Sequence, residues 1–253
     1  MAAKRFLILA SARSGSTALR NQINRHPDAI CHGEVFAHNR VLSVSSKIKA
    51  ALDGQLDRSF RERSPEVFLS RLFPEDDVRV QGAKLIFHQL LNERNMDFIH
   101  WIRKERPMPV LLWRRDLLAR ARSEYVLKYD VGLLKDDDIR ALTPADVERD
   151  CMRQIGMAQF VVNGVMGLGL PTPLCVDFED LIKGSEILNR TLDYLGLRSL
   201  GEDLKNDSRS REQQKKQRPI DDHMTSVVKH PSLEQFADVR APYLERFAET
   251  GGQ

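Results

Sequence analysis

Short apolar runs alternate along the chain with longer segments in which apolar residues recur every three or four positions. A run that is apolar at every position is typical of a strand buried on both faces, whereas the longer spacing is typical of an amphipathic helix. Strands that alternate with helices predict an α/β fold of three layers, with a central, mostly parallel sheet flanked by helices. The predicted strands are residues 6–10, 29–31, 78–87, 109–113 and 173–178.

Several of the predicted helices carry recognisable start and stop signals. Asp116 is placed to cap one helix, and Thr143 with Asp146 resembles a capping box at the start of another. Ser64 precedes a proline at the first helical position of a third, and Gly196 is expected to end the last one. The predicted helices are residues 18–26, 65–73, 96–104, 117–128, 144–165 and 186–195.

The C-terminal part of the chain carries a weaker pattern. Residues 201–222 are charged and poor in apolar residues, which predicts a loop, and residues 223–253 are expected to close the fold as a helical segment broken at Pro242. The basic run in the loop is typical of a solvated surface, and the functional alternative is a flap over a bound nucleotide. The basic residues are Lys215, Lys216 and Arg218, and the apolar residues of the closing segment are Leu233, Phe236, Tyr243, Leu244 and Phe247. No repeat or linker divides the chain, so residues 1–253 are expected to form a single domain.

Composition narrows the classes of function. The net charge of +3 argues against a broad nucleic-acid surface, and the apolar share of 42% is enough for a sizeable core. The three cysteines are widely spaced and form neither a disulfide framework nor a zinc motif. No apolar run is long enough for a membrane anchor or a signal sequence, so we expect a cytoplasmic protein without a transmembrane segment.

The most informative segment is Ser11-Ala12-Arg13-Ser14-Gly15-Ser16-Thr17, between the first predicted strand and the first predicted helix. A hydroxyl-rich turn at this place presents backbone N–H groups and the positive end of a helix to an anion, and Arg13 adds a full positive charge. The segment lacks the Gly-Lys-Ser/Thr of a Walker A motif. It therefore predicts a phosphate-bearing nucleotide held in a different way from that of an ATPase.

A second candidate segment follows the strand at residues 109–113. Arg115 comes just after this strand, and Ser123 lies two helical turns further on. An arginine at a strand end and a hydroxyl on the adjoining helix can hold one phosphate from two directions. Arg114 is a rival for this role, but no hydroxyl lies eight residues beyond it.

These segments resemble the sulfotransferases that use 3′-phosphoadenosine 5′-phosphosulfate. The first signature of that family is a Lys/Arg-Ser-Gly-Ser/Thr loop between a strand and a helix, which implies that the loop holds the 5′-phosphosulfate. The second is an arginine followed eight residues later by a serine, which implies that Arg115 and Ser123 hold the 3′-phosphate. The loop residues concerned are Arg13, Ser14, Gly15, Ser16 and Thr17, and a softer third match is Phe178-Glu179-Asp180-Leu181.

The segment Gly33-Glu34-Val35-Phe36 resembles the Glu-x-Phe segment of bacterial sulfotransferases that act on trehalose, lipopolysaccharide or lipo-oligosaccharide. In that group the glutamate takes the proton from the acceptor hydroxyl, so the resemblance implies that Glu34 is the general base. His32 and His88 are alternative bases, because other branches of the family use histidine. Lys84 also matches a segment of the group, with no role assigned to it.

The resemblance implies a P-loop-like fold and the transfer of a sulfuryl group to a hydroxyl of a carbohydrate or glycolipid. Adenosine 3′,5′-bisphosphate would leave, with its charge stabilised by Arg13, and no metal ion is expected. A P-loop-type small-molecule kinase and a non-catalytic nucleotide-binding module are the alternatives. Because parallel sheets bind ligands beyond the carboxyl ends of their strands, we expect Arg13, Glu34 and Arg115 to lie along one edge.

Overall fold

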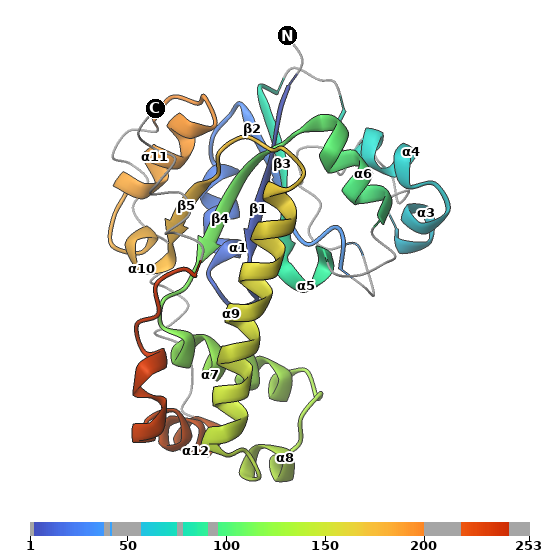
Figure 1. The fold of residues 1–253 in the computed structure, drawn as a ribbon. Helices are drawn as coiled ribbons and strands as arrows, with labels where there is room; N and C mark the ends of the chain where they lie inside the picture. Colours follow the sequence, from blue (N-terminus) through green and yellow to red (C-terminus); the bar gives the residue numbers. More distant parts are fainter. Residues whose placement is uncertain are drawn as a thin grey trace.

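The computed structural model of the chain describes residues 3–37, 41, 57–74, 78–90, 96–199 and 219–242. Five strands form one sheet in the order β2-β3-β1-β4-β5, and every neighbouring pair is parallel (Figure 1). The predicted α/β fold with a parallel sheet is therefore confirmed. The strands are β1 (Lys4–Ala10), β2 (Ala29–His32), β3 (Val80–Ile86), β4 (Met108–Trp113) and β5 (Leu174–Asp177).

Helices follow most of the strands, as expected for parallel strands that need crossover connections. The described helices are α1 (Ser16–Ile23), α3 (Arg58–Arg63), α4 (Pro65–Leu72), α5 (Phe87–Leu90), α6 (Met96–Glu105), α7 (Leu117–Asp130), α8 (Asp136–Arg140), α9 (Pro144–Met166), α10 (Phe178–Leu181), α11 (Glu186–Tyr194), α12 (Pro219–Val228) and the 3₁₀ helix η4 (Pro231–Phe236). Two of the predicted caps form as expected, whereas the Ser64 side chain makes no capping hydrogen bond at the start of α4. The Asp116 carboxylate accepts a hydrogen bond from the Ala119 N–H, and Thr143 and Asp146 form the capping box of α9.

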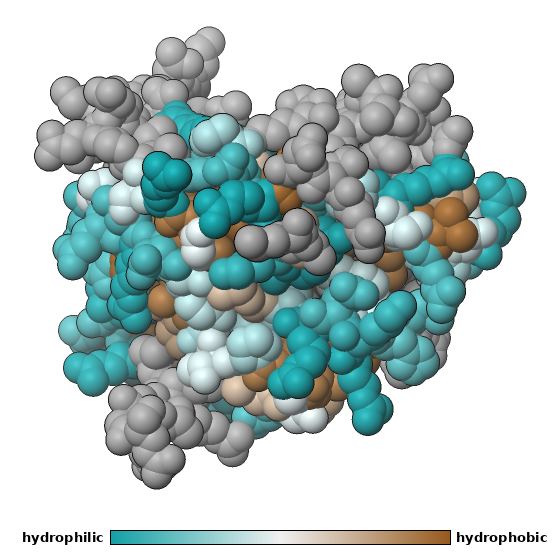
Figure 2. All heavy atoms as spheres, turned by 90° about the horizontal axis from the view of Figure 1, so that it is seen from above, coloured by the Kyte–Doolittle hydropathy of each residue, from teal (hydrophilic) through white to brown (hydrophobic). Residues whose placement is uncertain are grey.

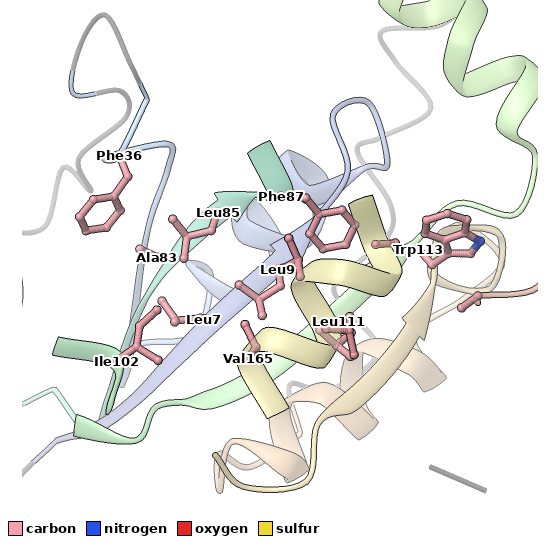
Figure 3. Packing of buried hydrophobic residues seen from close by; sticks show 14 of the residues in the cluster. Leu7, Leu9, Phe36, Ala83, Leu85, Phe87, Ile102, Leu111, Trp113 and Val165 are labelled. Atoms are coloured by element: carbon pink, nitrogen blue, oxygen red, sulfur yellow. The ribbon is translucent and has the colours of Figure 1, made fainter. Parts of the chain in front are cut away.

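Side chains of β1 enter two separate cores on the two faces of the sheet. Leu7 and Leu9 belong to the core on the α9 side, where they lie near Leu111 and Val165 (Figure 3). Phe6 and Ile8 belong to the other core, which α1 and α11 cover with Leu19, Ile23, Leu188 and Leu192. The near-continuous burial of β1 follows from this double covering.

Some predicted boundaries and elements were wrong. Helix α1 begins at Ser16 and ends at Ile23, two residues before the expected start and three before the expected end. Residues 219–222 were predicted as part of a loop, but they belong to α12, whose Met224 is fully buried against Ile139. Tertiary packing thus stabilises helical structure in a segment with a weak local pattern. Residues 201–218 and 243–253, with the basic run and the second closing helix predicted there, lie outside the described residues.

A helical lobe made of α7, α8, α12 and η4 lies beyond the carboxyl ends of the strands, and α9 runs along both the sheet and this lobe (Figure 1). Arg120 of α7, which is fully buried, forms an ion pair with Asp150 of α9, and Arg153 joins the same carboxylate at 2.6 Å. The C-terminal segment returns to the sheet, where the Trp113 indole donates a hydrogen bond to the Val239 carbonyl at 2.8 Å. The edge of the sheet where ligands are expected therefore faces this lobe.

The end of the molecule opposite the helical lobe is seen in Figure 2. Its surface is mainly hydrophilic, and the brown, hydrophobic areas on it are small and separate. None of the described helices is long and apolar enough to cross a lipid bilayer.

Candidate active site

The loop from Ser11 to Thr17 leaves β1 at the carboxyl edge of the sheet and leads into α1. Two of its residues have left-handed backbone conformations, Arg13 with φ 64° and Gly15 with φ 84°. The Ser14 hydroxyl donates a hydrogen bond of 2.8 Å to the Ser11 carbonyl, which closes the turn on itself. A tight turn of this kind ahead of a helix is the backbone geometry in which anion-binding nests form.

Two features favour glycine at position 15, its left-handed backbone conformation and the close packing of Phe178. A Cβ atom at this position would overlap two ring atoms of Phe178 and lie 3.3 Å from a third. Phe178 begins the short helix after β5, so the softer sequence match at residues 178–181 packs directly onto the loop. The sequence linked these segments only by resemblance, and the structure brings them into contact.

The loop and the serine of the second candidate segment also meet directly. The Arg13 Nε atom donates a hydrogen bond of 2.9 Å to the Ser123 hydroxyl on α7, across 110 positions of sequence. Arg114 reaches the same place, with its Nη1 atom 3.3 Å from the Arg13 carbonyl and its guanidinium 4.9 Å from the centre of the Phe178 ring. The guanidinium groups of Arg13 and Arg114 and the Ser123 hydroxyl therefore lie together at the loop.

Arg115 lies at the same carboxyl edge of the sheet, but it is surrounded by carboxylates that its position in the sequence did not predict. Its guanidinium is 3.4 to 3.9 Å from four carboxylates, those of Asp177, Glu179, Asp180 and Asp238. Glu179 also accepts hydrogen bonds of 3.1 Å from the backbone N–H groups of Arg115 and Asp116. Burial raises the pKa of Asp177, and the positive charge of Arg115 opposes this rise. The chain's own carboxylates thus already neutralise Arg115, and its predicted role with a phosphate stays a prediction.

Glu34 lies in a second cluster that is connected to the loop through Lys84. The Lys84 Nζ atom is 2.8 Å from Glu34 Oε1 and donates a hydrogen bond of 3.0 Å to the Thr17 hydroxyl. Gln89 donates a hydrogen bond of 3.2 Å to the other carboxylate oxygen of Glu34. Lys84 is nearly buried, whereas the Glu34 side chain keeps 29% of its surface exposed. The carboxylate is therefore accessible from solvent, while Lys84 holds it toward the loop of residues 11–17.

Lys84 is the residue whose place the sequence left open. It belongs to β3, the strand paired with both β1 and β2, and it lies opposite Ile8 in the register. A lysine inside a strand that is buried at every position is unusual, because burial of a charge without a partner is costly. A lysine in a buried strand was therefore the signal in the sequence that Lys84 has partners. The structure shows that these partners are Glu34, which follows β2, and Thr17, which follows β1.

The two histidines considered as alternative bases have different surroundings. The His32 ring is fully buried, and its Nε2 atom is 2.9 Å from the Leu72 carbonyl. Burial lowers the pKa of His32 to about 4, so the ring would be a weak base. The pKa of His88 on α5 is lowered by partial desolvation, and the negative charge of Glu34 opposes this shift. His88 stays the alternative base.

The fold is shared with known enzymes, although the sequence is distant from them. No family model matches the chain, and a search of curated proteins gave no match. Among solved structures, the chain is similar to a sulfotransferase from Alicyclobacillus acidocaldarius, with a TM-score of 0.53, 15% identity, and coverage of 89% of this chain and 91% of that one. It is also similar to the sulfotransferase domain of the Synechococcus PCC 7002 olefin synthase, with a TM-score of 0.52, 15% identity, and coverage of 100% and 96%. The chain thus has the P-loop-like α/β fold of these sulfotransferases.

Proposed function

We propose that this protein is a sulfotransferase that moves a sulfuryl group from 3′-phosphoadenosine 5′-phosphosulfate to the hydroxyl of an acceptor. The observation that carries the proposal is the hydrogen bond between Arg13 and Ser123. It joins the loop that matches the 5′-phosphate signature to the helix that matches the 3′-phosphate signature. One mononucleotide with phosphates at both ends is a ligand that suits such a pair of neighbouring sites.

The donor side of the site suits phosphate chemistry. The N–H groups of residues 14–17 and the positive end of α1 would bind the 5′-phosphate, and Arg13 would stabilise its charge as the leaving group departs. Ser123 and Arg115 are proposed for the 3′-phosphate, with Arg114 as the rival cation. No group of three metal-ligating side chains is found in the part of the chain that the structure describes, and the proposed reaction does not include a metal ion.

The acceptor side suits the removal of one proton. Glu34 would take the proton from the acceptor hydroxyl while that oxygen forms its bond to sulfur and the bond from sulfur to the nucleotide phosphate breaks. Lys84 contacts both Glu34 and Thr17, so its charge lies between the base and the leaving group. We propose that Lys84 orients the carboxylate and offsets the negative charge that gathers at the reacting centre.

We further propose that the acceptor is a carbohydrate or glycolipid, that nucleic acid is not a partner, and that the protein acts in the cytoplasm. The acceptor class is suggested by the match of residues 33–36 to bacterial sulfotransferases of that kind. The balanced net charge of +3 supports the exclusion of nucleic acid.

Calorimetric titration tests the donor assignment. Adenosine 3′,5′-bisphosphate is expected to bind in the micromolar range, and adenosine 5′-monophosphate at least tenfold more weakly because it lacks the 3′-phosphate. Ser123→Ala is expected to reduce the difference in affinity between the bisphosphate and the monophosphate. Ser70→Ala is the matched control, because the Ser70 hydroxyl lies on α4 and donates only to a backbone carbonyl of its own helix.

The titration also separates the proposal from its alternatives. Binding of ATP with Mg²⁺ in preference to the bisphosphate would indicate a kinase. Binding of the bisphosphate without transfer from the sulfated donor to any hydroxyl would indicate a non-catalytic nucleotide-binding module. Failure of the bisphosphate to bind would overturn the proposed function.

A further inference from the structure

A cavity of about 320 Å³ lies between α3, α4 and α6. Its size falls within the range of small-molecule pockets, which is about 300–1,000 Å³. Its wall is mixed: the apolar part comes from Phe36, Pro65, Phe68, Leu69 and Phe98, and the rest comes from charged residues. None of the functional residues predicted from the sequence lines it.

The aromatic part of the wall is fixed by ring stacking. The Phe36 ring stacks on Phe98 with centroids 3.8 Å apart, and it meets Phe68 edge-on at 6.2 Å. Phe98 in turn stacks on Trp101 at 5.3 Å. Stacked rings with both neighbours in place have little freedom to fill the cavity, so the space is preformed. The rings themselves provide no hydrogen bonds, so the stacked part of the wall suits an apolar group.

The same wall is continuous with the segment that carries the proposed base. Phe36 follows Glu34 by two residues, which span at most about 7 Å of chain. Arg61, buried in the cavity wall, donates hydrogen bonds of 2.7 Å to the Val35 carbonyl and 3.0 Å to the Ala37 carbonyl. The cavity wall and the Glu34 segment therefore form one connected unit.

The charges around the cavity indicate what kind of group enters it. Arg61 is the one cation among the described lining residues, and its Nη1 atom is engaged by backbone carbonyls. The other charged lining residues are Glu62 and Asp97, which are acidic. Glu62 is already paired with Arg58 at 2.8 Å, so a group in the cavity would meet Asp97 and the aromatic wall, and a neutral apolar group suits the aromatic part.

We propose that this cavity is an acceptor subsite that takes a neutral alkyl or aryl group attached to the alcohol being sulfated. The inference rests on the proposed function, because it needs Glu34 to receive the acceptor hydroxyl. It narrows the acceptor to a hydroxyl compound with an apolar part, such as a glycolipid, and makes a free sugar a poor substrate. Arg61 acts here as a positioning residue that holds the Glu34 segment against the occupied cavity.

The test compares hexyl β-D-glucoside with methyl β-D-glucoside, which carry the same ring hydroxyls and differ by five methylene groups. Binding is measured by calorimetry with adenosine 3′,5′-bisphosphate present, and transfer is measured with the sulfated donor. The hexyl compound is expected to bind at least tenfold more tightly and to show a kcat/KM at least tenfold higher, because its additional methylene groups leave water for the cavity. Equal values for the two glucosides would overturn the inference.

Leu69→Phe tests the location of the subsite by filling the cavity. It is expected to remove the preference for the hexyl compound while leaving nucleotide affinity unchanged. Val67→Phe is the control on the same helix, because Val67 is 46% exposed and lines a different groove. A preference that persists in folded Leu69→Phe would refute the assignment, and the wild-type comparison decides the matter if that variant does not fold.

The two proposals fail in different ways. Nucleotide binding with equal affinity for the two glucosides would overturn the subsite and leave the proposed function standing. Absence of nucleotide binding would overturn the proposed function, and the acceptor assignment with it.

Discussion

Replacement of Gly15 by alanine probes the phosphate-binding loop through two separate physical effects. The backbone effect comes from φ 84°, a left-handed conformation in which an L residue is less stable than glycine by about 1–2 kcal/mol. The packing effect comes from overlap between the new Cβ and the Phe178 ring, and overpacking of this kind costs about 1–3 kcal/mol. We therefore expect Gly15→Ala to lower the free energy of unfolding by about 2–5 kcal/mol. The nucleotide affinity is also expected to fall, because the loop must shift.

Gly132→Ala isolates the backbone effect. Gly132 has φ 72°, but a Cβ there meets no heavy atom within 4 Å, so only about 1–2 kcal/mol should be lost. Urea denaturation of both variants measures the difference between them. In the double variant Gly15→Ala, Phe178→Ala, removal of the ring should recover the packing part, which appears as a coupling free energy. A Gly15→Ala variant no less stable than Gly132→Ala would refute the reasoning.

Three further predictions concern Glu34, Lys84 and His32. Glu34→Gln is expected to keep nucleotide affinity within about threefold in calorimetry and to lower kcat by about 10²–10⁴-fold in a transfer assay, the range for loss of a general base; unchanged kcat would eliminate Glu34 as the base. Lys84→Met is expected to lower kcat by about 10²–10³-fold, because it removes the positive charge proposed to lie between the base and the leaving group. Lys183→Met, at an exposed lysine, is the control, and an equal kcat in the two variants would contradict this role. The pKa of His32 falls from 6.5 to about 4 on folding, so below pH 6.5 the unfolded state binds the additional proton and stability declines as the pH falls toward 4. Urea denaturation between pH 7 and 4 should show a loss of about 3 kcal/mol that is absent in His32→Gln, and identical pH profiles would contradict this cause.

Local patterns predicted the elements well where the chain carries strong signals. The apolar runs of the five strands and the caps at Asp116 and Thr143 depend on neighbouring residues, and all of them appear in the structure. Only the first turn of α12 was missed, because residues 219–222 carry a weak local pattern and the helix is stabilised by burial of Met224 against Ile139. Helix α8 was not among the predicted helices, and its Ile139 packs on Met224 of α12.

The sequence by itself indicated the parallel α/β architecture and a candidate phosphate-binding loop at residues 11–17. Both depend on short-range features, namely apolar runs and a hydroxyl-rich turn before a helix, whereas Glu34 was predicted as the base from the resemblance of residues 33–36. Only the tertiary structure decided that Arg13 meets Ser123, that Lys84 joins Glu34 to Thr17, and that four carboxylates surround Arg115. Those contacts join strand ends far apart in the chain, and their geometry follows from the order of strands in the sheet and the register between them, which residue spacing does not encode.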